Sequence, residues 1–244
     1  MKKTEIFYLI RQFYRIQEHR IAFGGQIRAL KKQKMNLNPL DEYFEDLQGL
    51  EKRMAKYISN SIKDEDIWIN FLKKVKGIGP ILGANLINLI DIKEAKHISS
   101  LWKFAGLDVV NGAAPKRKRG VVSTWNPLMR NLCWKIGNSL VRSNSPYRKF
   151  FDERKEHEKV HHPELKKFHI DRRARRYMVK RFLSDLWLAW RKQENLPISQ
   201  PYVVAQLGHS MEPSIIREER APKSKKRAKK IKKSTYTKRA NNKK

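Results

Sequence analysis

Apolar residues near the start of the chain recur every three or four positions, which is the spacing of an amphipathic helix. Two such seams run over residues 6–30 and 40–57, and Arg20 is a charged position in the first. The segment Asn36–Pro39 between them stops one helix and starts the next. The pattern predicts an antiparallel helical hairpin in residues 1–62. It is either a coiled-coil-like arm or two helices on a globular core, and it is a candidate surface for a homodimer.

The helical period continues in shorter pieces after this hairpin. Two short helices are expected over residues 66–92, and the others over residues 101–106, 128–140, 147–160 and 171–193. Residues 107–124 form either a loop or a small β-hairpin. The fold class is therefore mainly α. We expect a helical hairpin in residues 1–65, a helical domain in 66–210 and a disordered basic tail in 211–244.

Positive charge changes this picture from fold toward function. The chain has 55 Lys and Arg against 24 Asp and Glu, a formal net charge of +31. Residues 221–244 hold 12 of the basic residues and no acidic one, which leaves +19 on residues 1–220. A polyanion is needed to neutralise such a surface, and nucleic acid is the commonest. An anionic membrane surface is the weaker alternative.

Composition excludes several other classes of protein. The chain is 40% hydrophobic, which is enough apolar surface to bury a core. No apolar run approaches the roughly 20 residues that span a bilayer, so we expect a cytoplasmic, nucleoid-associated protein without membrane contact. Cys133 is the single cysteine, which argues against disulfides and Cys-based zinc sites.

Residues 72–87 form the sharpest motif and have the pattern of a helix-hairpin-helix. Gly77 and Gly79 are expected to adopt backbone angles that a Cβ forbids, Ile78 to fill the space between the helices, and Pro80 to begin the second helix. The first amides of that helix would then face a phosphate. The expected contact residues are Lys73, Lys74, Lys76, Gly77, Ile78 and Gly79. A tight turn used only for packing is the alternative.

Two further basic elements extend this expected contact. One is a loop with four consecutive cations, and the other is a helix face on which three cations recur every fourth residue. The loop residues are Lys116, Arg117, Lys118 and Arg119, and the face residues are Arg172, Arg176 and Lys180. A solvated loop and a localisation signal are the alternatives for the loop.

Histidines and tryptophans offer two other kinds of site. His157 and His161 are one helical turn apart, as zinc ligands can be, with His162 and His169 nearby. Their surroundings are rich in Lys and Glu, so we predict an exposed helix end and no metal site. The tryptophans, Trp102, Trp125, Trp134, Trp187 and Trp190, have the helical spacing of core residues more than that of a base-stacking surface.

Several motifs in order resemble one known family. The segments GIGPILGANLINLIDI (77–92), SSLWKFAGLDVV (99–110) and KRKRGVVSTWNPLMRNLCWKIGNSLVRSNSPYRKFF (116–151) resemble the C-terminal domain of insertion-sequence transposases of the IS116/IS110/IS902 family. Matching positions are Gly77–Pro80, Asp91, Ala105–Leu107, the 116–120 loop, and Leu128–Leu132 with Arg130. Residues 169–190 and 201–210 look like the tail of a subset of that family. The resemblance covers about residues 66–210 and adds Arg130 to the expected DNA contacts.

The resemblance also implies catalytic parts that this sequence lacks. Full-length members resemble a two-part enzyme, with four metal-binding carboxylates in an N-terminal domain and a nucleophilic serine in a C-terminal loop. This chain begins at the helical hairpin and has Asn111–Ala114 where that serine would stand. Ser123 is the remaining candidate nucleophile, and Thr124 is expected to cap the next helix. No cofactor is expected, and Mg²⁺ only if a partner supplies the carboxylates.

These observations lead to one main expectation and two alternatives. We expect a DNA-binding, transposase-like protein that is truncated or catalytically degenerate and that contacts the backbone of double-stranded DNA. A structured guide RNA is a second candidate partner. The alternatives are an active serine-type strand transferase that uses Ser123, and a structural protein that packages nucleic acid or binds RNA mainly through its tail.

Overall fold

The computed structural model describes residues 2–35, 37–109, 112–117 and 119–198, and every element in these ranges is helical. The helices are α1 (Lys3–Lys32), α2 (Asn38–Ser61), α3 (Asp66–Asn70), the 3₁₀ turn η1 (Leu72–Lys74), α4 (Pro80–Leu89), α5 (Ile98–Phe104), α6 (Pro127–Arg142), α7 (Arg148–His161) and α8 (Lys167–Gln193). The mainly-α prediction is confirmed. No strand occurs in the described part of residues 107–124, so the β-hairpin alternative is wrong there and the loop is correct. The predicted tail, residues 211–244, lies outside the described residues.

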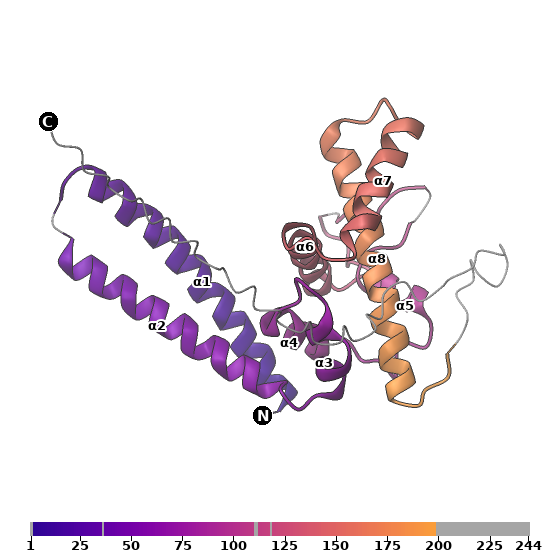
Figure 1. The fold of residues 1–244 in the computed structure, drawn as a ribbon, viewed down its shortest axis with the longest axis horizontal. Helices are drawn as coiled ribbons and strands as arrows, with labels where there is room; N and C mark the ends of the chain where they lie inside the picture. Colours follow the sequence, from indigo (N-terminus) through magenta and orange to yellow (C-terminus); the bar gives the residue numbers. More distant parts are fainter. Residues whose placement is uncertain (1, 36, 110–111, 118, 199–244) are drawn as a thin grey trace, which may run out of the picture.

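Helices α1 and α2 form an antiparallel arm that leaves the body of the molecule at one end (Figure 1). The base of the arm packs on α4, where the Asn88 side chain donates a hydrogen bond to the Lys3 carbonyl at 2.7 Å. At Gly24 the ring of Phe44 comes so close that an added Cβ would lie 2.9 Å from it. The predicted hairpin is therefore confirmed, and its outer part stands away from the core.

Arg20, the charged residue in the first seam, is neutralised inside the arm. It forms an ion pair with Glu51 of α2, and Gln17 donates a hydrogen bond to the same carboxylate at 2.8 Å. Partial burial alone would raise the pKa of Glu51, but the hydrogen bonds from Arg20 and Gln17 and the charge of Arg20 lower it overall. A polar position in the seam thus fixes how α1 and α2 are aligned.

Helix α8 is the centre of the body, and α3, α5, α6 and α7 pack around it (Figure 1). It begins four residues before the predicted Asp171, because nothing in residues 167–170 stops a helix. Its buried face includes Val179, Phe182 and Leu186, as predicted. Trp187 and Trp190 are buried as well, which confirms the core assignment for these two tryptophans.

Helix α6 lies between the arm and α8. Its buried residues are Met129, Leu132, Cys133, Ile136, Gly137 and Leu140. Leu128, the first residue of the predicted helix, is 41% exposed, because Met129 and Cys133 take the inward positions.

Two charged side chains are buried in the body and hold its helices together. Glu158 of α7 is fully buried and pairs with Arg154 on its own helix and with Arg173 of α8, whose Nε lies 2.9 Å from the carboxylate. Arg191 of α8 is only 3% exposed. It donates hydrogen bonds to the carbonyls of Ile92, Ala95 and Pro197 at 2.8–3.1 Å. These bonds fasten the end of α8 to the segment that follows α4.

Replacing Arg191 tests this fastening. Arg191→Met removes the donor from the buried carbonyl of Ile92 and one of the two donors from that of Ala95, which also accepts from Trp187, and an orphaned buried carbonyl costs about 1–3 kcal/mol. We expect the free energy of unfolding to fall by about 2–5 kcal/mol, measured by urea denaturation of the full chain. The neighbouring exposed Lys192→Met is the matched control, with an expected change within about 0.5 kcal/mol. Equal effects of the two variants would contradict a structural role of Arg191.

Candidate nucleic-acid interface

Helical elements lie on both sides of the predicted hairpin turn, and the one before the turn is short and broken. Helix α3 ends at Asn70, the turn η1 follows, and α4 begins at Pro80. The Ile78 side chain is buried between the elements, as predicted. Gly83 lets α4 approach Trp68, whose ring would lie 2.7 Å from an added Cβ. The small residues of α4 therefore serve close packing.

Gly77 has the backbone conformation that the sequence predicts, and Gly79 does not. Gly77 has a φ of +100°, and a Cβ there would also collide with the Ser143 side chain and lie 3.2 Å from the Ser139 carbonyl. Gly79 has φ −87° and ψ 173°, an extended conformation open to any residue, so that prediction is wrong. No atom lies within 4 Å of an added Cβ at Gly79.

The hairpin turn is held against the end of α6. The Ser139 hydroxyl donates a hydrogen bond to the Gly77 carbonyl at 2.6 Å, and the Ser143 hydroxyl donates to the Lys76 carbonyl at 3.3 Å. With its carbonyls bound on the inner side, the turn presents the start of α4 outward. Amides in the first turn of a helix have no partner inside the helix. Next to this first turn, the side of Gly79 on which a Cβ would lie is open space.

Lys73, Lys74 and Lys76 are all exposed beside this open space. They lie on η1 and on the turn that follows it, within a few residues of the start of α4. The structure therefore brings together the lysines and the helix terminus that the sequence predicts as one site. Their contact with DNA stays a prediction.

The basic loop lies next to the start of α6. Lys116, Arg117 and Arg119 are exposed, and Lys118 lies outside the described residues. Arg130 donates a hydrogen bond to the Pro115 carbonyl at 2.8 Å, and its guanidinium stands 5.0 Å from the centre of the Trp125 ring. Arg130 thus fixes the end of the loop.

Asn126, not Thr124, caps α6. The Asn126 side chain accepts hydrogen bonds from the amides of Leu128 and Met129 at 2.9 and 3.1 Å. Asn126 directly precedes Pro127, which takes the first helical position, so Thr124 is too far from the helix to cap it. Ser123 is half-buried in this loop, and no described histidine or carboxylate hydrogen-bonds to its hydroxyl. Its role as a nucleophile stays a prediction.

Arg172, Arg176 and Lys180 share one face of α8, but they are used differently. Arg176 donates to the carbonyls of Gly106 and Asp108, both at 3.1 Å. Lys180 Nζ stands 4.0 Å from the centre of the Trp102 ring, and burial together with the charge of Arg176 lowers its pKa. Arg172 is exposed and lies over the Phe168 ring at 3.9 Å.

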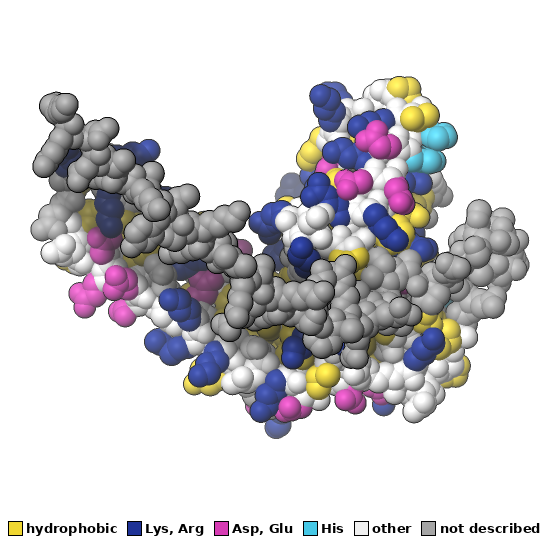
Figure 2. Space-filling view, viewed as in Figure 1, with side chains coloured by type: hydrophobic (Ala, Val, Ile, Leu, Met, Phe, Trp, Pro, Cys, Tyr) yellow, Lys and Arg dark blue, Asp and Glu magenta, His cyan; other side chains and the backbone are white. Residues whose placement is uncertain are grey.

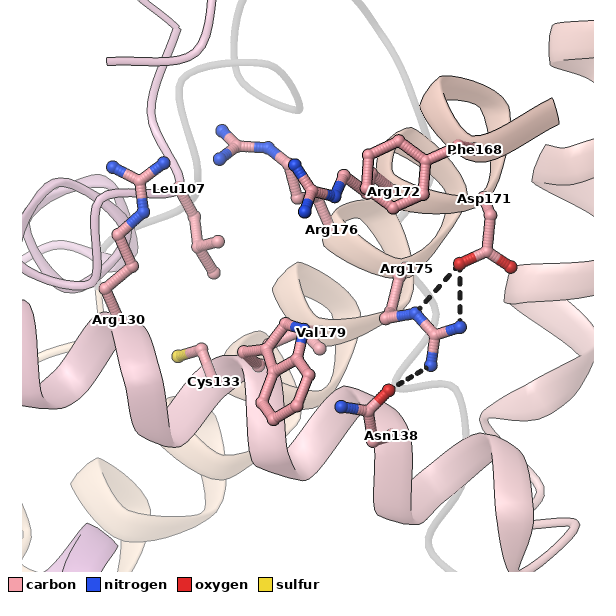
Figure 3. Close-up of a pocket in the computed structure, with 11 residues that line it drawn as sticks. Leu107, Arg130, Cys133, Asn138, Phe168, Asp171, Arg172, Arg175, Arg176 and Val179 are labelled. Carbon is pink, nitrogen blue, oxygen red and sulfur yellow. Dashed lines mark hydrogen bonds and ion pairs between the residues drawn. The ribbon is translucent and has the colours of Figure 1, made fainter. Parts of the chain in front are cut away.

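Arg172 also lines a pocket of about 500 Å³ between α6 and α8, shown in Figure 3. Four arginines surround it, and Leu107, Cys133 and Val179 add apolar atoms. Burial raises the pKa of the Cys133 thiol to about 12, so the thiol is protonated near neutral pH and is part of the wall, not a nucleophile. The residues that line the pocket are Leu107, Arg130, Cys133, Trp134, Asn138, Phe168, Asp171, Arg172, Arg175, Arg176 and Val179.

Sequence reasoning did not identify Arg175 and placed Trp134 in the core, although both residues line this pocket. Arg175 lies between α6 and α8, where it donates to Asp171 at 2.7 and 3.2 Å and to the Asn138 side chain at 2.7 Å (Figure 3). Trp134 was assigned to the core but is 61% exposed. The available signal was the four-residue spacing of Arg130, Trp134 and Asn138, which places them on one face of α6.

Charge alone does not single out an interface. Figure 2 shows Lys and Arg side chains spread over both the arm and the body, with acidic side chains among them.

The rings of His157 and His161 stack at 4.0 Å. Among the described residues, no three His, Cys, Asp or Glu side chains lie close enough together to hold a metal ion. No described helix is both long and apolar enough to cross a membrane.

The two hairpin glycines give a direct test of this geometry. Gly77→Val places a β-branched residue at positive φ against α6, and we expect a lower melting temperature and a loss of about 2 kcal/mol or more. Gly79→Val meets no atom and keeps an extended backbone, so its thermal unfolding should differ little from that of the unmodified chain. Circular dichroism melts of both variants check this, and equal destabilisation would contradict the described turn.

Comparison with known proteins gives one result for this region. No curated protein and no solved structure matches the chain. Residues 69–152 match the model of the transposase IS116/IS110/IS902 family. The matched range starts in α3, contains the hairpin, the basic loop and α6, and ends in α7. Residues 69–152 therefore form a transposase domain of the IS116/IS110/IS902 family, which implies a role in DNA transposition.

Proposed function

We propose that this protein binds the backbone of double-stranded DNA through the hairpin between η1 and α4. The observation that carries the proposal is that Gly79, which directly precedes the first turn of a ten-residue helix, is exposed and has open space where a Cβ would lie. A phosphate oxygen accepts hydrogen bonds from amides at such a terminus and is attracted by its partial positive charge. Because the contact is with phosphate, it positions the protein on a duplex without reading base sequence.

The exposed lysines of the hairpin supply the charge for this contact. Lys73, Lys74 and Lys76 flank the helix terminus, and the 116–119 loop and Arg172 extend the basic footprint. Three further cations mainly hold the surrounding structure in place. Arg130 and Arg176 donate hydrogen bonds to loop carbonyls, and Lys180 packs on Trp102. The proposed binding face therefore consists of a small number of exposed Lys and Arg side chains, and the cations bound inside the protein support the elements that carry them.

Other partners and states remain predictions within this proposal. A homodimer through residues 1–62 would bury apolar side chains that the arm leaves exposed, among them Tyr8, Ile21 and Tyr57. A guide RNA would meet the same exposed cations as DNA. A truncated or degenerate enzyme would bind DNA and leave strand chemistry to a partner.

The dependence of binding on salt tests the hairpin. Each phosphate contact contributes about 0.9 to the slope of log K against log salt for duplex DNA. Replacing Lys73, Lys74 and Lys76 together by Gln should lower this slope by about 2–3 and weaken binding of every duplex sequence alike. Fluorescence anisotropy of a labelled duplex at several salt concentrations gives the slope, and Gly79→Val should weaken binding without changing the fold.

The matched control is a triple variant on the arm. Lys52, Arg53 and Lys56 are exposed cations on α2, and replacing them by Gln removes the same charge from the arm and not from the hairpin. We expect a clearly smaller change in slope. If both triple variants lower the slope equally, or if binding survives the hairpin changes and disappears only when residues 221–244 are deleted, the packaging alternative is favoured instead.

A covalent test separates binding from serine-type strand transfer. Under the proposal, incubation with DNA leaves no protein–DNA adduct after denaturing electrophoresis, and Ser123→Ala binds DNA as the unmodified chain does. An adduct that Ser123→Ala abolishes would establish the active strand transferase in place of a binding-only protein.

A further inference from the structure

One face of α6 carries a row of side chains in which Trp134 and Arg142 are exposed and Arg130 and Asn138 are half-buried. Arg130, Trp134, Asn138 and Arg142 follow one another at four-residue spacing and therefore share this face. Burying an indole is strongly favourable, yet Trp134 is 61% exposed in the middle of the row. An exposed large ring between two arginines is a surface suited to a flat, negatively charged ligand.

The row is hollowed on both sides of Trp134. The pocket toward α8 has a volume of about 500 Å³, and a second pocket, of about 530 Å³, lies toward α1. Trp134 and Asn138 line both pockets. The second pocket adds Lys135 and Arg142, so cations are present on either side of the indole. Both volumes fall within the range of about 300–1,000 Å³ that is usual for sites of small organic groups.

The charges of the first pocket indicate an anion. Four arginines line it and Asp171 is the one carboxylate among the lining residues. Arg175 is neutralised by Asp171, and the guanidinium groups of Arg130 and Arg176 each donate to backbone carbonyls. Arg172 remains exposed, and it is held in place by the face of the Phe168 ring. Figure 3 shows Arg172 and Arg176 reaching toward the side of the pocket where Arg130 lies.

The same helix connects this row to the hairpin. Ser139 and Ser143, in the last turns of α6, hold the carbonyls of Gly77 and Lys76. Arg142 lies between these two serines in sequence and is exposed. A nucleic acid bound at the hairpin therefore meets the end of the row first, with Trp134 two helical turns further along α6.

We propose that Trp134 and the pockets beside it hold one unpaired nucleotide of the bound nucleic acid. The base stacks on Trp134, and its phosphate is bound by Arg172. This inference rests on the proposed function, because the hairpin brings the strand to the row. Both an unpaired DNA nucleotide and an unpaired RNA nucleotide have the required flat base and phosphate, so the experiment includes both.

The test compares labelled duplexes of one sequence in binding to the full chain. One duplex is fully paired, one carries a single-nucleotide bulge, and one carries the same bulge without its base. The bulged strand is DNA in one series and RNA in the other. Stacking of one base on an aromatic side chain corresponds to about 5- to 150-fold in affinity. We expect the bulge with a base to bind tighter than the abasic bulge by a factor in this range, in at least one series.

Variants at Trp134 then locate the effect. Trp134→Ala should bring the ratio of the dissociation constants for the abasic bulge and the bulge with a base close to one. Trp134→Phe should retain most of the difference between these two constants. Tyr57→Ala is the matched control, because Tyr57 is an aromatic residue with the same 61% exposure on the arm. It should keep the full ratio. Arg172→Gln should weaken binding of both bulged duplexes, since both retain the phosphate.

The outcomes distinguish this inference from the proposed function. A ratio near one in both series, or an unchanged ratio in Trp134→Ala, overturns the nucleotide site even if the paired duplex is bound normally. A paired duplex whose binding does not depend on Lys73, Lys74 and Lys76 overturns the hairpin contact instead. A ratio that depends on Trp134 only in the DNA series or only in the RNA series supports the site and identifies the strand it holds.

Discussion

The structure depends on how closely the turn before α4 approaches α6. At Gly77 the backbone lies so near Ser139 and Ser143 that no side chain fits, and the two hydroxyls bind the carbonyls of the turn. This contact aims the start of α4 outward and fixes α6 relative to it. A glycine required by packing and a glycine whose Cβ position is open space thus lie two residues apart.

The large positive charge of the chain serves two different purposes in the structure. Several cations are internal connectors. Arg191 binds three carbonyls at the end of α8, Arg176 binds two carbonyls of the loop after α5, and Arg20 pairs with Glu51 inside the arm. Arginine suits this work because its planar group donates several hydrogen bonds in fixed directions. These cations are bound inside the protein, whereas the exposed cations of the described residues are spread over both the arm and the body.

Local patterns in the sequence predicted the helices well, because hydrophobic periodicity identifies each helix and Pro or Gly residues mark its ends. The arm, α6, α7 and α8 all lie where the periodicity places them, and the helix-hairpin-helix is identified by its glycines. The errors concern features that depend on neighbours in space. Gly79 is extended, because Pro80 and the α4 start require no positive φ there. Asn126 replaces Thr124 as the cap because Asn126 directly precedes Pro127, the first residue of α6. The pocket between α6 and α8 needs the packing of two helices distant in sequence, which no periodicity reveals.

The bonds of Arg191 also hold the residues that directly follow α8. Its side chain reaches the Pro197 carbonyl, and its own carbonyl accepts a hydrogen bond from the Leu196 amide at 2.8 Å. The segment that follows α8 is therefore turned back onto the helix and closes over a buried cation. A shortened protein cut at the last helical residue, Gln193, would expose that guanidinium to water and loosen the connection between α8 and the segment after α4. A fragment designed for crystallisation or for spectroscopy should extend past Pro197.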